Sequence, residues 1–377
     1  MSLLWWMLLP VGSIWVYSRL WRRWTDGKLS YRIQIPSETS WEGDSLTVEM
    51  ELENHSWLPL PWVAVEQPLP PVLRSKGRDS ERLRWATYLL PRQRVKAGFR
   101  VTCVRRGFYH WEPARLETSD GIGLEERLYQ LDPGCSVLVR PRPLEEAELI
   151  SELREILGEK VIHRWYQEDP SRLSGVRPWQ EGDPFRWIHW AASARSDEWL
   201  VKQFETTSHT TIHLLLNFQF FELHRIGADS RMIDFSCRLA ANLFRQAEGM
   251  GLSYGLESNA SWQGVGGMSV PPGNSPVHLD WTEEALGRLR PTAAESFSHL
   301  LDRLSGRLDP GAQLLVITGY WDRRIAAGLE RLRGEGHPLT LFLLDEPGRE
   351  WDLFGLPQDV IRIPVPLPVG EQKEVPA

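Results

Sequence analysis

Side chains that could take part in chemistry are most concentrated between Gly175 and Arg195. This run holds three arginines, one aspartate, a serine and a histidine. Ser193 and His189 offer a nucleophile and a base, but the chain has no Gly-x-Ser-x-Gly elbow and no glycine-rich phosphate loop. His189 also lies among bulky tryptophans. The sequence therefore predicts that the protein is not an enzyme, and an uncharacterised hydrolase is the least favoured alternative.

The three arginines of this run favour architecture or binding over catalysis. Arg177, Arg186 and Arg195 could pair with Asp183 and neighbouring carboxylates, and so fix the run to a sheet. They could also face outward and grip an acidic partner, because a guanidinium group binds a carboxylate through two parallel hydrogen bonds. Both interpretations stay open at the level of the sequence.

The run also carries local structural signals. Asp183 followed by Pro184 predicts a helix start, since the carboxylate can cap free N–H groups and proline suits the first helical position. Apolar residues then recur at helical spacing up to Ala194, which predicts a helix with its tryptophans packed inward. Alternation over residues 198–205 predicts a strand directly afterwards.

This order of residues resembles the signature of the bacterial domain-of-unknown-function family 58, a Gly-Asp-x-x-Arg-x-Ile-x-Trp run followed by Ser-Ala-Arg and a strand. Residues 106–109 and 120–124 are similar to two further family elements, although Gly121 and Ile122 depart from the second. The signature positions are Arg177, Gly182, Asp183, Arg186, Ile188, Trp190, Ser193, Ala194 and Arg195.

The resemblance implies a von Willebrand factor A-like α/β domain and a partner, a MoxR-type AAA ATPase, but no established reaction. We accordingly expect a non-catalytic interaction or adaptor protein. The first alternative is a metal-dependent von Willebrand A-type ligand-binding protein, which would hold Mg²⁺ through oxygen ligands at the carboxyl end of its sheet.

The positions that would hold such a metal are altered in this chain. Asn217 stands where the resemblance implies an aspartate, Gln219 and Phe221 where it implies serines, and Gly319 where it implies a second aspartate. Only Thr292 offers a matching hydroxyl group. Because a hard divalent cation prefers anionic oxygen ligands, we expect a degenerate site without metal and no cofactor.

Composition narrows the possible partners. The net charge of −7 argues against a nucleic-acid-binding protein, which would display a basic face, and no such cluster occurs. The three cysteines are widely spaced and odd in number, which is neither a disulfide framework nor a metal-ligand pattern.

The amino terminus is apolar from Leu3 to Tyr17 and could extend to Trp21, close to the roughly 20 residues that a bilayer core requires. Arginines at positions 19, 22 and 23 follow it, which by the positive-inside rule keeps the rest of the chain in the cytoplasm. We expect a single anchor in the cell membrane or a segment lying in the plane of the interface, and ordinary packing in a core is the remaining alternative.

The remaining periodicity predicts a multidomain chain. Strict alternation over residues 46–53 and turn signals up to residue 142 predict an antiparallel β-sandwich. Strands and helices alternate after residue 210, which predicts an α/β (Rossmann-like) domain with a mostly parallel sheet. The predicted parts are a membrane anchor (1–24), a β-sandwich (30–142), a connecting helix (143–165), a von Willebrand factor A-like domain (166–365) and a disordered tail (366–377).

Overall fold

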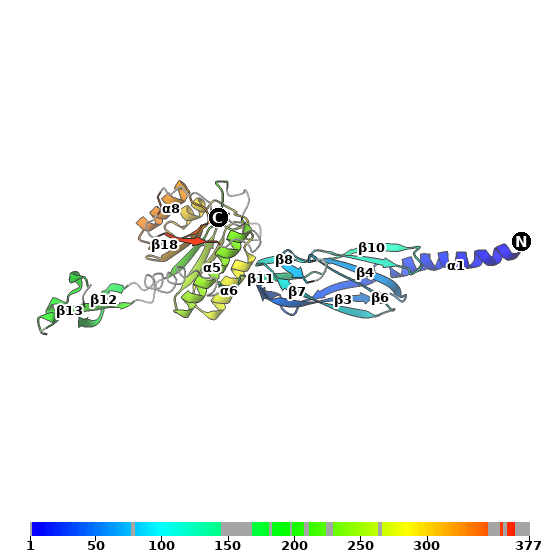
Figure 1. Cartoon of the computed structure of the whole chain (residues 1–377), viewed down its shortest axis with the longest axis horizontal. Coiled ribbons are helices and arrows are strands. Elements are labelled where there is room, and N and C mark those ends of the chain that lie inside the picture. The colour runs from blue at the N-terminus through cyan, green and yellow to red at the C-terminus, as the bar shows by residue number, and fades with distance from the viewer. Residues whose placement is uncertain are drawn as a thin grey trace, which may run out of the picture. The chain divides into compact units, whose positions relative to one another are not determined.

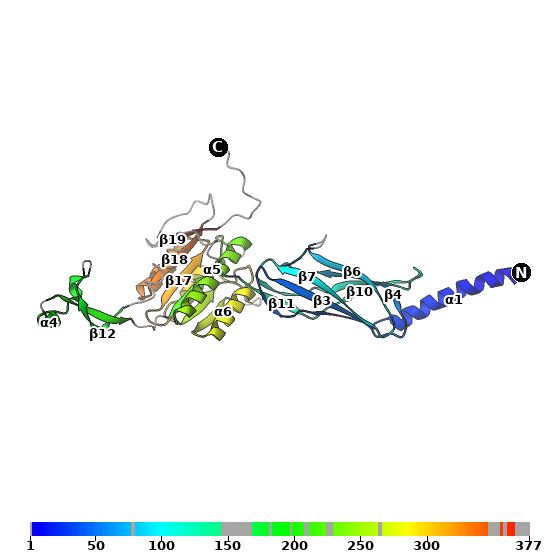
Figure 2. The same cartoon turned by 60° about the horizontal axis from the view of Figure 1, so that its bottom comes forward.

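The computed structural model describes residues 2–76, 80–144, 168–180, 183–196, 198–206, 211–223, 229–262, 266–345, 355–356 and 360–365. The predicted tail, the signature residue Gly182 and nearly all of the predicted connecting helix lie outside these ranges. The chain forms two compact units: residues 1–142 with 286–289, and residues 143–285 with 290–377. The first is a mainly antiparallel sheet region, and the second contains a mixed, mostly parallel sheet (Figure 1, Figure 2).

The N-terminal unit contains two four-stranded antiparallel sheets, in the orders β1-β3-β7-β5 and β10-β9-β4-β6. A third sheet, β2-β11-β8, has three strands. The bounds are β1 Leu29–Gln34, β2 Thr39–Trp41, β3 Ser45–Asn54, β4 Leu60–Pro68, β5 Leu73–Ser75, β6 Arg82–Leu89, β7 Arg94–Cys103, β8 Gly107–His110, β9 Ala114–Ser119, β10 Glu126–Leu131 and β11 Ser136–Arg140.

One hydrophobic core joins the two larger sheets. Val48 and Met50 of β3 share it with Val63 of β4 and Leu116 of β9, and all four are fully buried. The alternation that predicted the strand at residues 46–53 arises because successive side chains of a strand point to opposite faces. The apolar side chains face this core, while Glu49 is exposed.

The predicted anchor forms a helix, α1 Ser2–Thr25, whose carboxyl end is fixed to the N-terminal unit. Trp21 is fully buried in the core, and its Nε1 donates a hydrogen bond to the Pro59 carbonyl oxygen over 3.0 Å. Ser18 is buried and hydrogen-bonds Asp120. No helix in the described ranges combines the length and the apolar character needed to cross a membrane, so the predicted transmembrane anchor is not supported.

The sheet of the C-terminal unit has six strands in the order β16-β15-β14-β17-β18-β19. Only β16 is antiparallel to its neighbour. The strands are β14 Ile212–Leu216, β15 Tyr254–Ser258, β16 Met268–Gly273, β17 Gln313–Thr318, β18 Leu339–Asp345 and β19 Val360–Pro364. The helices are α5 Ser230–Gly249, α6 Pro276–Arg288, α7 Phe297–Leu304 and α8 Arg323–Gly334.

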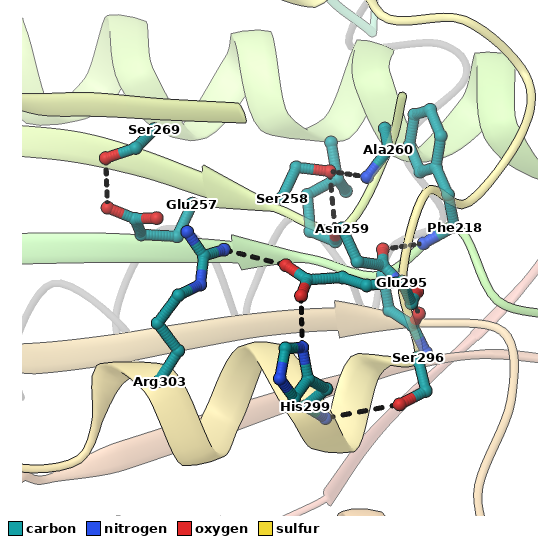
Figure 3. A network of polar contacts seen from close by, with 12 residues as sticks. Phe218, Glu257, Ser258, Asn259, Ala260, Ser269, Glu295, Ser296, His299 and Arg303 are labelled. Carbon is teal, nitrogen blue, oxygen red and sulfur yellow. Dashed lines mark hydrogen bonds and ion pairs between the residues drawn. The ribbon is translucent and has the colours of Figure 1, made fainter. Parts of the chain in front are cut away.

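Helices cover both sides of this sheet. Helices α7 and α8 share a core cluster with Leu215, Leu314 and Val316, and α5 contacts β14, β15 and β17. Figure 3 shows α7 and the green helix α5 on opposite sides of the strands. The predicted strands and helices of this region are confirmed, and the glycine- and proline-rich run at 262–274 contains β16. Two elements, α6 and β19, were not predicted.

A separate two-stranded antiparallel sheet carries the signature. It consists of β12 Glu168–Pro178 and β13 Leu200–Thr206, and it is called the signature hairpin below. The predicted continuous helix from residue 183 is wrong: a 3-10 turn (η2 Phe185–Trp187) and a short helix (α4 Trp190–Ser193) occupy the region. The helix is interrupted because Ile188 forms a β-bridge with Val201.

Candidate functional site

The carboxyl ends of β14, β15 and β17 place polar side chains at one edge of the parallel sheet. Asn217 follows β14, Asn259 follows β15, and Thr318 ends β17. Because the three strands are parallel neighbours, their ends meet at the same edge, which is where α/β sheets usually bind ligands. All three side chains are buried, with exposed fractions of 1% or less.

These three side chains form a closed hydrogen-bond network, called the edge network below. Nδ2 of Asn217 donates to Oγ1 of Thr318 over 2.9 Å, and Oδ1 of Asn217 accepts from Nδ2 of Asn259 over 3.0 Å. The hydroxyl group of Thr318 donates to the Tyr320 carbonyl over 2.6 Å. Oδ1 of Asn259 accepts from the Phe218 backbone N–H over 2.7 Å (Figure 3). The network thus fastens the three strand ends to one another and to the loops that follow them.

Gln219 extends this network to α7. Its backbone N–H donates to Oδ1 of Asn217 over 2.8 Å, and its Oε1 accepts from the Phe297 backbone N–H over 2.9 Å. Its Nε2 donates to the Phe221 carbonyl over 3.0 Å. Gln219 is itself buried, so its amide links the β14 loop to the first turn of α7.

The other expected metal positions lie outside the edge network. Thr292 is exposed, and the Phe221 side chain is 51% exposed. Gly319 is buried against Phe220, and a Cβ atom added there would lie only 2.5 Å from the Phe220 ring. The structure therefore brings together Asn217 and Gln219 but not Thr292 or Phe221.

The donor set of the edge network does not fit a divalent cation. Its oxygens belong to neutral amide and hydroxyl groups, and they already accept hydrogen bonds from N–H groups. Mg²⁺ demands a near-octahedral oxygen shell and is usually bound through carboxylates. Within the described ranges, no three His, Cys, Asp or Glu side chains gather closely enough to hold a metal. The amides bridge the loops at the sheet edge through hydrogen bonds.

A second polar cluster lies beside the edge network, between β15 and α7 (Figure 3). Glu295 stands between Arg303, whose Nη2 donates to it over 2.8 Å, and the ring of His299. Oγ of Ser269 donates to Glu257 over 2.5 Å. A Cβ atom added to Gly267 would lie 2.5 Å from the Ser258 carbonyl and 3.1 Å from Glu295, so only glycine fits beneath this pair.

The Glu257 carboxyl group of this cluster has a raised pKa. Burial raises the pKa of Glu257, because it favours the neutral form, while the Ser269 hydrogen bond and the Arg303 charge act in the opposite direction. Sequence reasoning missed Glu257, Asn259 and Glu295. The run Glu257-Ser-Asn259 at the end of a buried strand was the available signal for the first two.

The signature hairpin is fixed by Arg177 and Asp183. The guanidinium group of Arg177 donates two hydrogen bonds, each 2.7 Å long, to the Asp183 carboxylate. The backbone N–H of Gln180 donates to the same carboxylate over 2.9 Å. The Arg177 and Gln180 hydrogen bonds lower the pKa of Asp183. Because Asp183 is engaged in this way, it does not cap the following turn as the sequence predicted.

Ser193 and His189 are engaged with local backbone. Oγ of Ser193 accepts from the Leu200 N–H over 2.8 Å and donates to the His189 carbonyl over 3.1 Å. Nδ1 of His189 accepts from the Ala192 N–H over 3.0 Å and caps α4. These contacts hold the turn against β13.

Aromatic side chains gather on the surface of the signature hairpin. The rings of Trp179, Phe185 and Trp199 contact one another pairwise, with centroids 6.1–6.2 Å apart. Phe185 is 63% exposed and Trp199 is 53% exposed. Trp190 was expected to pack inward but is 65% exposed. Of the signature arginines, Arg186 and Arg195 are exposed, whereas Arg177 is half-buried in its ion pair.

Comparison with curated proteins finds "Uncharacterized protein YeaD" of Bacillus subtilis (strain 168), 25% identical over 223 residues. The match spans 58% of this chain and 54% of YeaD, so the chain spans about half the length of that relative. Among solved structures, the CARDB domain of the PF1109 protein from Pyrococcus furiosus is 15% identical, with a TM-score of 0.21 over 29% of this chain and 91% of that one.

Trypsin-activated alpha-2-macroglobulin from Escherichia coli is 16% identical, with a TM-score of 0.22 over 31% of this chain and 8% of that one. At these TM-scores the two likenesses support no conclusion about fold or function. Residues 175–351 match the family described as "Protein of unknown function DUF58". That range begins at the signature and includes both the edge network and the second polar cluster, which contains Glu257 and Glu295. Over these residues the chain is similar to the DUF58 family.

Proposed function

We propose that the protein is a non-catalytic adaptor whose signature hairpin docks an acidic surface of a partner protein. The observation that carries this proposal is the exposed aromatic cluster of Trp179, Phe185 and Trp199 on a two-stranded sheet. A lone hairpin is at best marginally stable in water, and exposed aromatic clusters on soluble proteins commonly mark interaction sites.

Charge complementarity supports the acidic nature of the partner. Arg186 and Arg195 are exposed near the aromatic cluster, and arginine and tryptophan are the residue types most enriched at the energetic centres of interfaces. Arg177 has a different role in this proposal, because it is engaged with Asp183 and holds the hairpin in shape. In this proposal Arg177 has the architectural role, and Arg186 and Arg195 have the docking role.

The family resemblance suggests a MoxR-type AAA ATPase as the partner, working with a von Willebrand A-like domain. The edge network fits a structural role in this proposal, since its amides link the strand ends to one another. In this proposal the sheet edge is a rigid platform, and binding takes place on the hairpin.

We also propose that α1 lies against the cytoplasmic surface of the membrane. Its described part exposes Trp15, Leu20 and Trp24, while Ser18 and Trp21 face the N-terminal unit. Apolar and aromatic side chains interspersed with arginines such as Arg19 are typical of helices bound in the interface plane. Flotation with anionic vesicles tests this point: binding should fall in Leu20→Glu and persist in Val277→Glu, a change of an even more exposed apolar residue elsewhere.

Pairwise binding to purified MoxR-type ATPases of the source genome tests the docking proposal. We expect binding by the full chain, a loss of at least about tenfold in affinity for Trp199→Ala and for Arg195→Glu, and no change for Trp281→Ala. Trp281 is a matched control, because it is also 53% exposed and lies on α6 of the same unit. Undiminished binding in both hairpin variants would show that the ATPase docks elsewhere, and binding to none of the ATPases would remove the partner.

A further inference from the structure

Large apolar side chains stand exposed on loops at one end of the N-terminal unit. Single exposed apolar side chains are ordinary on a protein surface, whereas a group of them in one place marks a contact. The group is called the apolar loop end below, and its members, 52–69% exposed, are Trp57, Leu90, Ile122 and Leu124.

The strand register brings these loops to the same end of the unit. They are the connections β3–β4, β6–β7 and β9–β10. Leu60, the first residue of β4, pairs with Leu89, the last residue of β6. Ser119, the last residue of β9, pairs with Trp62 near the start of β4. Among the described residues of the connections at the opposite end, Val104 is the one exposed large apolar side chain, at 38%.

Two of these loops satisfy their backbone polar groups through one buried side chain. Nδ2 of Asn54 donates to the Leu58 carbonyl over 2.9 Å and to the Leu90 carbonyl over 3.1 Å. Its Oδ1 accepts from the Ser56 N–H over 2.9 Å. The Leu90 N–H donates to Oε1 of Gln93 over 2.7 Å. The tips of the β3–β4 and β6–β7 connections are therefore tied together.

The third loop satisfies its backbone through Asp120. Oδ1 of this buried aspartate accepts from the Ile122 N–H over 3.0 Å and from the Gly123 N–H over 2.8 Å. The same oxygen accepts from the Leu124 N–H over 3.3 Å. Because its N–H groups are paired, this loop can enter less polar surroundings without the cost of unsatisfied donors.

A guanidinium group stacks on the tryptophan of the apolar loop end. Arg92 lies 4.6 Å from the centroid of the Trp57 ring. Helix α1 carries the same pair of residue types, with Arg19 4.7 Å from the centroid of Trp15. Tryptophan is enriched at the level of lipid headgroups, and a neighbouring arginine can bind a lipid phosphate. Both pairs therefore match the chemistry of an anionic membrane surface.

The apolar loop end is continuous with the attached end of α1 (Figure 2). Trp21 donates to the carbonyl of Pro59 in the β3–β4 connection, and Arg22 pairs with Glu125 in the β9–β10 connection. A surface that receives the last turns of α1 therefore also meets these loops. Separate loop tips suit a fluid bilayer, because it admits each tip without a matching pocket.

We propose that the apolar loop end inserts into the headgroup region of an anionic lipid bilayer, with Trp57, Ile122 and Leu124 in the interface and Arg92 at a lipid phosphate. This extends the proposed membrane contact of α1 to the body of the N-terminal unit, and it rests on that contact. Attachment through both the helix and the loops fixes the orientation of this unit on the membrane.

Flotation of the full chain with phosphatidylcholine vesicles that contain phosphatidylglycerol tests the proposal, with the lipid concentration varied to give an affinity. We expect Leu124→Glu to weaken binding at least about tenfold. Leu128→Glu is the matched control, because Leu128 is 52% exposed on β10 of the same unit, outside the loops. Its affinity should stay within about twofold of the unaltered chain. Arg92→Gln should weaken binding to these vesicles and leave the weaker binding to pure phosphatidylcholine unchanged.

The variants separate the loop contact from that of α1. Loss of binding in Leu20→Glu with undiminished binding in Leu124→Glu would overturn the loop contact and leave that of α1 in place. Equal losses in Leu124→Glu and Leu128→Glu would also overturn it, because the added charge and not its position would then decide. Absence of binding by the unaltered chain would overturn both contacts. Circular dichroism of every variant distinguishes loss of membrane binding from loss of the fold.

Discussion

Replacing Asn217 with aspartate tests whether the edge network is a closed structural device or a metal site one substitution away from function. The change removes a donor and introduces a carboxyl group at the centre of three hydrogen bonds. The two bonds accepted by Oδ1 survive. The bond to Thr318 does not, because the Thr318 hydroxyl already donates to the Tyr320 carbonyl and would face a second oxygen.

The expected magnitude follows from these contacts. Losing one buried hydrogen bond costs about 1 kcal/mol, and leaving a buried charge uncompensated costs about 3–5 kcal/mol. At neutral pH we therefore expect Asn217→Asp to lower the free energy of unfolding of the C-terminal unit by about 3–5 kcal/mol. The protonated carboxyl group regains a donor, so most of this cost should disappear in acid.

The sign of the pH dependence follows from the same reasoning. The introduced carboxyl group has a folded-state pKa above its unfolded value, because burial disfavours its charge. Stability is therefore highest below the unfolded pKa and is lost as pH rises through the folded pKa. A difference of about 3 kcal/mol between the two limits corresponds to a rise of about two pKa units.

Urea unfolding with amide exchange resolved to β14 and β17 measures the effect, and the N-terminal unit serves as an internal reference. Asn274→Asp is the matched control: Asn274 also donates through Nδ2, to the Gly251 carbonyl, but it is exposed. We expect its change in stability to stay below about 1 kcal/mol. Equal stability of Asn217→Asp in acid and at neutral pH, or its full rescue by millimolar Mg²⁺, would refute the reasoning.

Three further predictions concern other parts of the chain. Trp21→Ala should lower the unfolding free energy of the N-terminal unit by about 3–5 kcal/mol, because the change empties a fully buried site and leaves the Pro59 carbonyl without its donor. Urea unfolding measures this loss. A change within experimental error would mean that α1 is not part of the core. Amide-exchange protection of the signature hairpin should be present above the ordinary carboxyl pKa and be lost as pH falls through the lowered pKa of Asp183. Arg177→Lys should move that loss to higher pH. If the loss of protection occurred at the same pH in the variant, the role of the ion pair between Arg177 and Asp183 would be contradicted. Glu257→Gln keeps an acceptor for Ser269 and removes a group whose raised pKa makes the stability of the wild type fall as pH rises through that pKa. In thermal unfolding the variant should therefore match the wild type at about pH 4 and be more stable than the wild type at about pH 8. The opposite order would show that the fold stabilises the carboxylate.

Sequence periodicity predicted the elements whose stability is local. Helix α5 lies in the region where alternating helices and strands were expected, and it spans residues 230–249 because its apolar spacing and its Asp229 cap are encoded within the segment itself. Strand β3 was predicted for the same reason, through strict alternation. By contrast, β12 was missed: its pairing with β13 contains register shifts, and it depends on residues more than twenty positions later.

The candidate site was predicted only in part. Asn217, Gln219 and Gly319 were expected at the carboxyl end of the sheet because the resemblance to a von Willebrand factor A-like domain implies metal ligands at these positions. Their partners could not be predicted, because the contacts depend on the order of the strands in the sheet. Thr318 meets Asn217 because β14 pairs with β17, although β15 and β16 stand between these two strands in the chain. The failed helix at residue 183 has a similar cause, because an ion pair with Arg177 engages the aspartate that local rules assign to a cap.

The buried indole of Trp21 has a mechanical consequence. Helix α1 is 24 residues long, which at 1.5 Å per residue is about 36 Å. Its last turns are attached to the N-terminal unit by Trp21, by Ser18 and by the ion pair of Arg22 with Glu125. Because these contacts bury the last turns of the helix, a force applied to the N-terminal part of α1 would act directly on the core around Pro59.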